Sequence, residues 1–282
     1  MSLQLLHHNF IEKLEKIYPP SEAENIWQIA LQKALPTTDI KKRIKDDAVA
    51  PSEIELLLAI ENRLLKHEPI QYIINECWFY DIPFYVDANV LIPRPETEEL
   101  VDWIIKENNV NKELVILDIG TGSGCIPIIL KRKLPLAKLF SCDISKQALT
   151  VAKKNASTYN TDINFINLDF LNTDNFSFLP EGDIIVSNPP YVPDSNKASM
   201  RKNVLDYEPH KALFVEDNDP IIFYNRIGEF GLQKLKPGGK IYVEGHEDFA
   251  GNIVESFQQK GYKTSVKKDL QGKQRMVKAV LI

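Results

Sequence analysis

The residues best suited to chemistry are Asn188-Pro189-Pro190-Tyr191, which follow the mostly apolar segment 183–187. A residue before proline favours extended backbone, and proline has no N–H group, so the turn is stiff and presents carbonyl oxygens beside the side-chain oxygen of Asn188. Two fixed acceptors can hold both hydrogens of a planar –NH2 group and aim its lone pair at a methyl donor, while Tyr191 packs on the flat group. The alternative is an ordinary Pro-Pro turn. We predict that Asn188, Pro189 and Tyr191 are catalytic and that, with Pro190, they bind the substrate.

A glycine-rich loop runs from Asp118 to Gly124 after another apolar segment. Glycines at alternate positions let the chain turn tightly and let a ligand approach the backbone. A dinucleotide fingerprint would need its third glycine at position 125, which is Cys125, and Asp118 would repel a pyrophosphate. The cationic sulfonium and ammonium groups of S-adenosylmethionine fit this loop better than NAD does, the alternative being a plain glycine-rich turn. The predicted cofactor-binding residues of the loop are Asp118, Gly120, Thr121, Gly122, Ser123 and Gly124.

Acidic residues follow two more of the apolar segments. Asp143 stands 19 residues after Gly124, where a carboxylate can accept both hydroxyls of a ribose; the alternative is that it only caps the next helix. Asp169 and Phe170 could bond an adenine amine and stack on its ring, although Phe170 could also belong to the core. The sequence therefore predicts that Asp143, Asp169 and Phe170 bind the cofactor together with Asn188.

These motifs lie in a region where predicted strands and helices alternate, which indicates an α/β fold with a doubly wound, mainly parallel seven-stranded sheet. The expected strands are 114–117, 138–142, 163–168, 183–187, 240–244, 262–267 and 275–281, and the expected helices are 96–106, one after Gly124, 146–158, 221–235 and 249–259. The last two strands are joined too tightly for a helix and should pair antiparallel. Ligands of such sheets bind at the carboxyl ends of the strands. If the strand ending at Asp118 lies beside the strand ending at Ser187, both motifs face one crevice.

The N-terminal part of the chain has a different pattern. Residues 1–67 place apolar residues three and four apart, which predicts a small helical bundle or, alternatively, a lid. Ser21 and the pair Ser52 and Glu55 have the positions of helix N-caps. Aromatic residues around Asp81-Ile82-Pro83 predict a hairpin within a hinge linker of residues 68–95, and residues 96–282 form the expected catalytic domain.

Composition narrows the class of protein. The 282 residues are 44% hydrophobic and 26% charged, with a net charge of −5, which are globular values. The first 95 residues hold 10 basic and 14 acidic residues and the other 187 hold 24 and 25, so neither part has the basic excess of a protein that holds nucleic acid. We expect no stable nucleic-acid partner, no membrane span and no signal peptide. Three widely spaced cysteines argue against a metal site or disulfides and for the cytoplasm.

The motifs together resemble a known family. The glycine loop and Asn188-Pro189-Pro190-Tyr191 are similar to those of class I S-adenosylmethionine-dependent methyltransferases that act on an –NH2 nitrogen. Pro69-x-Gln71-Tyr72-Ile73 and Ile92-Pro93-Arg94-Pro95-Glu96-Thr97-Glu98 narrow the resemblance to the PrmC/HemK family of release factor glutamine N5-methyltransferases. Tyr207-Glu208-Pro209 and Asp269-Leu270-x-Gly272-x-x-Arg275 are also similar. The chain departs from the family at Asn75, where the family usually has Gly, and at Gly245-His246.

The resemblance implies a class I methyltransferase fold with an N-terminal helical domain that recognises the substrate. It implies methyl transfer to the glutamine side-chain amide in the Gly-Gly-Gln motif of class 1 peptide chain release factors, a step in translation termination that leaves S-adenosylhomocysteine. Arg94 and Glu96 would then bind substrate near the hinge. The alternative enzyme is an exocyclic-amine methyltransferase of RNA or DNA bases, and a further alternative is a non-catalytic adaptor that kept the fold.

Overall fold

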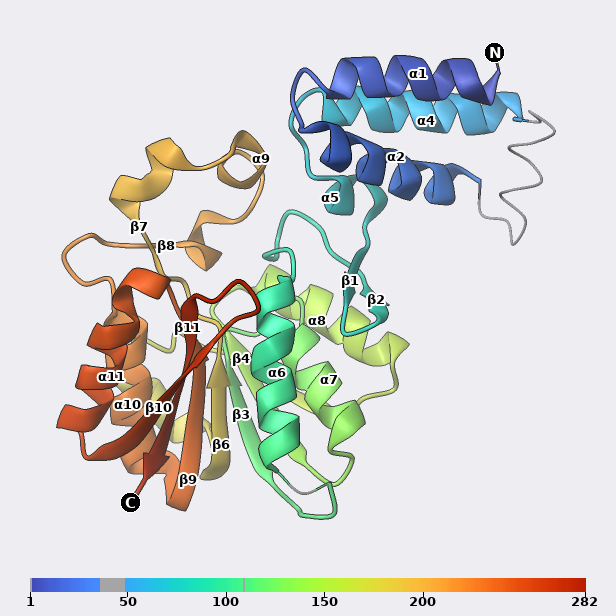
Figure 1. Cartoon of the computed structure of the whole chain (residues 1–282). Coiled ribbons are helices and arrows are strands. Elements are labelled where there is room, and N and C mark those ends of the chain that lie inside the picture. The colour runs from blue at the N-terminus through green and yellow to red at the C-terminus, as the bar shows by residue number, and fades with distance from the viewer. Residues whose placement is uncertain (1, 36–48, 109) are drawn as a thin grey trace. The chain divides into compact units, whose positions relative to one another are not determined.

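The computed structural model describes residues 2–35, 49–108 and 110–282 (Figure 1). The chain forms two compact units. One comprises the chain up to Glu76 together with Arg201–Tyr207, and the other comprises Cys77–Met200 and Glu208–Ile282. The segment expected to be a linker, residues 68–95, is thus divided between the two units. Each unit is described by itself below.

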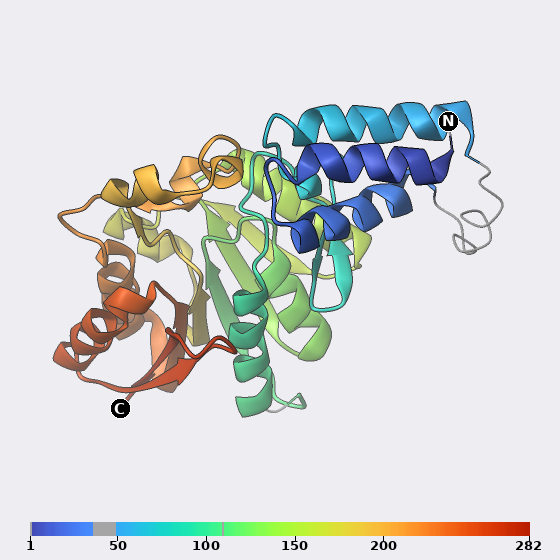
Figure 2. The same cartoon turned by 45° about the horizontal axis from the view of Figure 1, so that its top comes forward.

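The first unit is a helical bundle of α1 (Leu3–Leu14), α2 (Pro20–Ala34), α4 (Pro51–Leu64) and the short α5 (Ile70–Ile74), with α9 (Lys202–Leu205) added from far along the chain (Figure 2). The apolar stripe predicted for α1 is buried, with Phe10 and Leu14 at 3% and 0% exposure. These side chains form one core with Trp27 of α2 and Leu57 of α4. The helices therefore form because each can bury one apolar face against its neighbours.

The predicted N-caps of α2 and α4 are wrong. Helix α2 begins at Pro20, one residue before Ser21, and α4 begins at Pro51, with Ala50 as its N-cap. Proline suits the first helical position because its missing N–H would have no partner there in any case. Glu53 takes the role expected of Glu55, since its Oε2 accepts the Ala50 N–H at 2.7 Å.

Helix α5 contains the Gln71-Tyr72-Ile73 motif and was not predicted as a helix. It ends at Asn75, whose φ of 55° lies in the left-handed region. Glycine adopts this conformation without strain, and asparagine is among the few other residues that tolerate it. The departure at Asn75 therefore preserves the backbone that a glycine would allow.

The second unit opens with the predicted hairpin, formed by β1 (Cys77–Phe79) and β2 (Ile82–Phe84) in antiparallel register. The two turn residues, Tyr80 and Asp81, have positive φ values of 52° and 63°. Two such residues make the turn whose twist matches a tight hairpin. Phe79 and Phe84 are buried against the main core, so the hairpin belongs to this unit.

The predicted seven-stranded sheet is confirmed, with the order β10-β11-β9-β6-β3-β4-β5. Strands β3 to β6 and β9 are parallel, and β11 runs antiparallel to both β9 and β10 as expected. The strands are β3 (Val115–Ile119), β4 (Lys138–Asp143), β5 (Ile163–Asn167), β6 (Gly182–Ser187), β9 (Leu235–Glu244), β10 (Tyr262–Lys268) and β11 (Gln274–Leu281). Strand β9 begins earlier than predicted because Leu235 already pairs with Gly182, before a register shift.

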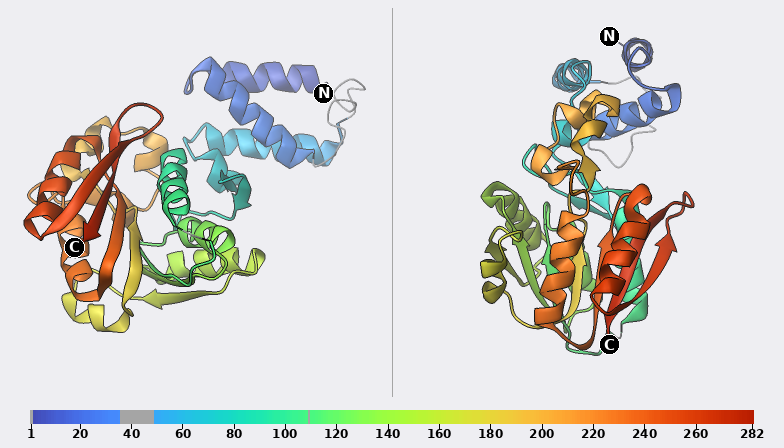
Figure 3. Two further views of the ribbon diagram at one scale, coloured as in Figure 1. Left: turned by 60° about the horizontal axis from the view of Figure 1, so that its bottom comes forward. Right: turned by 90° about the vertical axis from the view of Figure 1, so that its left-hand side faces the viewer.

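Helices cover both faces of this sheet (Figure 3). Helices α6 (Pro95–Glu107), α7 (Cys125–Lys133) and α8 (Lys146–Thr158) share one core with it, and α10 (Ile222–Lys234) and α11 (Ala250–Gln259) share the other. The remaining short elements are β7 (Val192–Pro193), β8 (Phe214–Val215) and the 3-10 turns Thr173–Phe178, Asp194–Ser199, His210–Ala212 and Glu247–Phe249.

Strand order reverses between β3 and β6, because the chain runs outward through β4 and β5 before it returns to β6. Ile119 and Ser187 are partners at the carboxyl ends of these two strands, and the Ser187 Oγ donates to the Ile119 carbonyl at 2.7 Å. The glycine loop and the Asn-Pro-Pro-Tyr turn therefore leave the sheet side by side, which meets the condition under which the sequence predicts that both motifs face one crevice. This is the position at which open α/β sheets bind ligands.

Asn155 of α8 connects the glycine loop to the segment that follows the hairpin. Its buried side chain donates to the carbonyls of Ser123 and Tyr85, both at 2.9 Å, and accepts the Tyr85 N–H at 2.8 Å. Asn155 is 1% exposed, so loss of these bonds leaves the buried Ser123 carbonyl and the half-buried backbone of Tyr85 without these partners. The asparagine therefore helps to hold the loop at the site.

We expect Asn155→Ala to lower the free energy of unfolding by about 2–4 kcal/mol, because each buried group left unpaired costs about 1–3 kcal/mol. Lys153→Ala, on the exposed face of the same helix, is the control and should change it by less than about 0.5 kcal/mol. Urea unfolding followed by circular dichroism measures both variants. Equal stability of the two variants would contradict a structural role for Asn155.

Candidate active site

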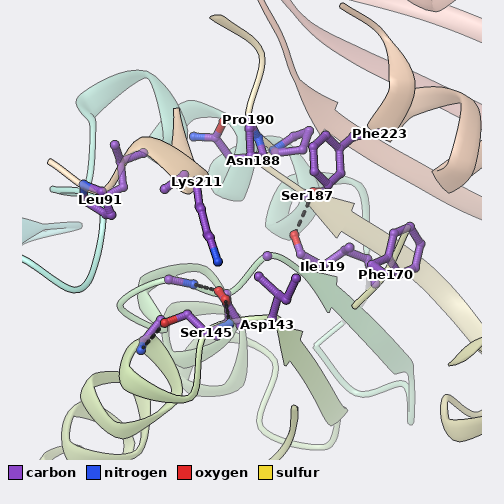
Figure 4. Close-up of a pocket in the computed structure, with 18 of the residues that line it drawn as sticks. Leu91, Ile119, Asp143, Ser145, Phe170, Ser187, Asn188, Pro190, Lys211 and Phe223 are labelled. Carbon is purple, nitrogen blue, oxygen red and sulfur yellow. Dashed lines mark hydrogen bonds between the residues drawn. The ribbon is translucent and has the colours of Figure 1, made fainter. Parts of the chain in front are cut away.

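A cavity of about 610 Å3 lies at the carboxyl edge of the sheet, within the second unit (Figure 4). The glycine loop, the end of β4, the segment after β5 and the Asn-Pro-Pro turn all contribute to its wall. The predicted site residues that line it are Gly120, Thr121, Gly122, Ser123, Asp143, Asp169, Phe170, Asn188, Pro189, Pro190 and Arg94. The fold thus brings most of the predicted site into one cavity.

The glycine loop has the backbone that its glycines allow. Gly120 and Gly122 have φ values of 76° and 53°, and a Cβ at either position would meet open space. The N–H groups of Gly120 and Thr121 both donate to the Cys142 carbonyl, at 2.9 and 3.0 Å, which holds the loop against β4. The two glycines therefore expose backbone to the cavity, as required of a loop that wraps a ligand.

Asp143 ends β4 and faces the cavity (Figure 4). One carboxylate oxygen accepts the Gly122 N–H at 3.0 Å, and the other accepts the Ser145 N–H at 2.8 Å. Burial raises the pKa of Asp143, while these N–H bonds oppose the shift. Helix α8 is capped by the Ser145 hydroxyl, so Asp143 is not its N-cap. Each carboxylate oxygen keeps a second lone pair for a ligand hydroxyl.

Asp118 does not line the cavity. Its side chain is completely buried beneath the loop, where the Ser141 hydroxyl donates to it at 2.5 Å. Burial raises the pKa of this carboxyl to about 7, against the stabilising bond from Ser141. The sequence correctly placed Asp118 at the strand end, but the side chain supports the loop from below and any effect on a bound cation acts through that loop.

Asp169 and Phe170 follow β5 and line the cavity. The Asp169 side chain is exposed and accepts the Leu171 N–H at 3.0 Å. The Phe170 ring is 5% exposed and packs against Phe176 and Phe230, with ring centroids 5.3 and 5.2 Å away. The ring belongs to the core, as one interpretation expected, and it also borders the cavity, whereas its contact with an adenine stays a prediction.

The Asn188 side chain has one bonded and one unbonded end. Its Nδ2 donates to the Thr97 Oγ1 at 2.9 Å, and its buried Oδ1 has no hydrogen-bond partner in the part of the chain that the structure describes.

Tyr191 is outside the cavity wall. Its hydroxyl lies 3.5 Å from Glu244, and burial raises the pKa of this hydroxyl. The N–H of Tyr191 donates to the Leu213 carbonyl at 3.2 Å, which fixes the exit of the turn.

The two predicted residues of the hinge motif differ in position. Arg94 lines the cavity and donates to the buried Glu208 at 2.6 Å, so it joins the Ile92-to-Glu98 motif to the Tyr207-Glu208-Pro209 motif. Burial raises the pKa of Glu208 in opposition to Arg94. Glu96 is outside the cavity wall and accepts from Gln271 at 3.1 Å.

Sequence reasoning missed two residues at this site. Glu244 is a buried acid at the end of β9, and its Oε2 accepts from Thr97 at 2.7 Å. Its position directly after the apolar strand segment was an available signal. Lys211 extends across the cavity towards Asp143 (Figure 4), and its exposed turn carries no pattern that could have indicated this.

Within residues 2–35, 49–108 and 110–282, no group of three or more His, Cys, Asp or Glu side chains could hold a metal ion. In the same ranges, no helix has the length and apolar character needed to span a membrane.

Comparison with known proteins shows which family model, relatives and solved structures are similar to this chain. Residues 97–207 match the family model "Methyltransferase small domain". Release factor glutamine methyltransferase from Flavobacterium psychrophilum is 45% identical over 280 residues and 95% of each chain, and the one from Bacteroides thetaiotaomicron is 42% identical over 270 residues, 95% of this chain and 96% of that one. The structure of a methyltransferase from Pyrococcus furiosus is similar in fold, with a TM-score of 0.50 and 16% identity over 78% of this chain and 96% of that one.

The sheet order and the paired helix layers are those of the class I methyltransferase fold. Within that class, the chain belongs to the release factor glutamine methyltransferase family.

The pKa of Asp118 leads to a prediction for stability. Because the pKa in the folded state, about 7, exceeds the unfolded value, the wild type should lose stability as pH rises from about 4 to 7. Asp118→Asn removes this charge at nearly constant shape. The unfolding free energy of Asp118→Asn minus that of the wild type should therefore rise over this range, by on the order of 3–4 kcal/mol. Urea titrations of both proteins in the same buffers measure the difference, and a difference independent of pH would show that Asp118 is not buried as a neutral acid.

Proposed function

We propose that this protein transfers a methyl group from S-adenosylmethionine to the side-chain amide nitrogen of the glutamine in the Gly-Gly-Gln motif of class 1 peptide chain release factors. The observation that carries the proposal is the unpaired, buried Oδ1 of Asn188 at the rim between the glycine loop and the Pro-Pro turn. A buried acceptor without a partner is costly, so a ligand donor is its natural complement. The names of the relatives supply the substrate.

The cavity fits S-adenosylmethionine in its chemistry. Gly120 and Gly122 leave space and backbone for the methionine part, and Thr121 and Ser123 also line the cavity, whereas Gly124 lies outside its wall and packs against Ala152 of α8. Asp143 would hold the ribose hydroxyls with its remaining lone pairs. The rim of Phe170 would face the adenine, and Asp169 would lie near its amine. Asp118 would act indirectly, by holding the loop from below.

The residues of the turn would prepare the substrate nitrogen. An amide nitrogen is a poor nucleophile because its lone pair is delocalised into the carbonyl group. Asn188 Oδ1 and a backbone carbonyl of the Asn188-Pro189 turn would accept its two hydrogens, which favours a pyramidal nitrogen and directs its lone pair. Pro189 and Pro190 keep these acceptors in place, since neither can donate a competing N–H. Tyr191 lies outside the cavity wall and would act by fixing the exit of the turn through its N–H bond to Leu213, and Arg94 and Glu96 would contact the flanking substrate chain.

S-adenosylmethionine supplies a methyl group on a positively charged sulfur, and transfer of that group leaves neutral S-adenosylhomocysteine. Asn188 and the turn carbonyl would hold the substrate amide with its nitrogen facing the methyl group that the cofactor supplies, and the nitrogen would release one proton to solvent after the transfer. No residue needs to remove that proton beforehand. The chain therefore contributes alignment and two fixed acceptors, which are the main sources of rate enhancement for such a step.

The alternative substrate, an exocyclic amine of a nucleic-acid base, would use the same two acceptors. It would also require a surface that neutralises phosphates. The net charge of −5 and the protein substrates named by the relatives both favour the release factor. We also propose the cytoplasm as the site of action, because Cys77, Cys125 and Cys142 are widely spaced in the sequence and all buried, as is common in proteins of a reducing compartment.

We expect Asp143→Ala to weaken S-adenosylmethionine binding by roughly ten- to a hundredfold, because hydrogen bonds to a charged acceptor contribute about 1.5–3 kcal/mol. Asp162→Ala, an exposed acid that does not line the cavity, is the control and should bind as the wild type does. Isothermal titration calorimetry measures both. Wild-type affinity in the Asp143 variant would remove this carboxylate from the cofactor site.

We expect the protein to add a single CH2 unit to the Gly-Gly-Gln glutamine of a purified class 1 release factor, and to leave a release factor with that Gln changed to Ala unmodified. Mass spectrometry of the digested product locates the added group. The rate should depend only weakly on salt, because few phosphate contacts would be displaced. Efficient labelling of RNA or DNA, with the release factor left unmodified, would instead support the nucleic-acid alternative.

A further inference from the structure

The orientation of the Asn188 amide decides whether the turn can hold an –NH2 group. The oxygen and nitrogen ends of an asparagine side chain have nearly the same shape, so their positions are decided by hydrogen-bond partners alone. If the amide were inverted, its NH2 group would take the place of Oδ1 and oppose the substrate hydrogens. The site therefore needs a device that keeps the nitrogen end turned towards Thr97.

Thr97 lies in the first turn of α6 and is 3% exposed. Its hydroxyl oxygen is 2.9 Å from Asn188 Nδ2 and 2.7 Å from Glu244 Oε2. A hydroxyl has one hydrogen to donate. If that hydrogen goes to Glu244, the hydroxyl can only accept from Asn188, and Asn188 must present its nitrogen.

Glu244 decides where that hydrogen goes. The carboxylate is 1% exposed at the end of β9, and an ionised carboxylate can only accept hydrogen bonds. The groups around it come from every neighbouring element. Thr97 and Glu96 lie on α6, Arg275 on β11 and Tyr191 on the turn after β6, while the Tyr224 hydroxyl of α10 donates to the Glu244 main-chain carbonyl at 2.9 Å.

We infer that Glu244 and Thr97 are positioning residues that fix the hydrogen-bond polarity of Asn188, so that its Oδ1 is the acceptor offered to the substrate amide while Glu244 is ionised. This inference rests on the proposed function and extends it to a chain of three side chains. Neither Glu244 nor Thr97 needs to touch the reacting atoms. Glu244 accepts the hydrogen of the Thr97 hydroxyl, so that Thr97 can only accept a hydrogen from Asn188. This sequence of bonds fixes the orientation of the Asn188 amide.

The chain of bonds makes the rate depend on the protonation of Glu244. Burial raises the pKa of this carboxyl to about 7, with Glu96 acting in the same direction and Arg275 and the Thr97 hydroxyl opposing it. A protonated carboxyl can donate to Thr97, which frees the Thr97 hydrogen to bond the other end of Asn188. The rate of methyl transfer should therefore rise with pH through about 7 and then become constant.

The variant pair Thr97→Val and Thr97→Ser separates polarity from packing. Valine keeps the shape and removes the hydroxyl, whereas serine keeps the hydroxyl. In single-turnover methyl transfer to a release factor, we expect Thr97→Val to slow the step by roughly 10- to 100-fold, less than the 10²–10³ expected when a fixed contact is removed outright. Thr97→Ser should recover most of the rate, and S-adenosylmethionine affinity should change little in either. Thr150→Val, on the exposed face of α8, is the control for the substitution itself.

Glu244→Gln provides a second test, since its amide can donate or accept and no longer imposes one polarity. The rise in rate through pH 7 should be absent from this variant and from Thr97→Val, and the rate of Glu244→Gln at pH 8 should be reduced. Wild-type rates in Thr97→Val, equal losses in the Val and Ser variants, or an unchanged pH profile in Glu244→Gln would each overturn the inference. Failure of the proposed function has a different signature, because the wild type itself would then leave the release-factor glutamine unmodified.

Discussion

The parallel pairing of β3 with β6 is the constraint on which the rest of the site depends. It places Ile119 beside Ser187, so that the glycine loop and the Asn-Pro-Pro-Tyr turn leave the sheet at neighbouring points. The outward path through β4 and β5 brings Asp143 to the same edge, one strand further away. Motifs that are about 70 residues apart in the sequence thereby form one wall, and the bond from the Ser187 hydroxyl to the Ile119 carbonyl joins their two strand ends.

Buried acids support this wall from behind. Asp118 lies beneath the glycine loop, Glu208 holds Arg94 and the Ile92 N–H, and Glu244 holds Thr97. Burial raises the pKa of all three carboxyl groups, which means that each costs stability when it is ionised. A buried polar group of this kind gives a definite orientation to its partner. Ionisation of these buried acids lowers the stability of the folded protein, but their hydrogen bonds fix the positions of the glycine loop, Arg94 and, through Thr97, Asn188.

The two positions at which the chain departs from the family pattern, Asn75 and Gly245, differ in what their backbone and surroundings allow. At Asn75 the backbone is left-handed, a conformation that suits glycine best and asparagine next. Gly245 shows the opposite case, because a Cβ there would lie 2.7 Å from Ile253 and 3.0 Å from the Tyr224 hydroxyl. The first departure from the family pattern is therefore a change of side chain on a retained backbone, and the second is a glycine whose neighbours, Ile253 and Tyr224, would have to shift to admit a side chain.

The sequence by itself determined the order and type of the main elements of the sheet domain, because apolar periodicity and glycine or proline positions are local signals. It also determined the residues of the glycine loop, Asp143 and the Asn-Pro-Pro-Tyr turn, whose chemistry depends on neighbours in the chain. The tertiary structure alone decided that Asp118 lies below the cavity, that Glu96 and Tyr191 lie outside its wall, and that Lys211 reaches into it. It alone also joined Thr97 and Glu244, 147 residues apart, through a hydrogen bond of 2.7 Å. Such contacts between distant segments depend on how α6, β6 and β9 pack, and no local pattern of residues encodes that packing.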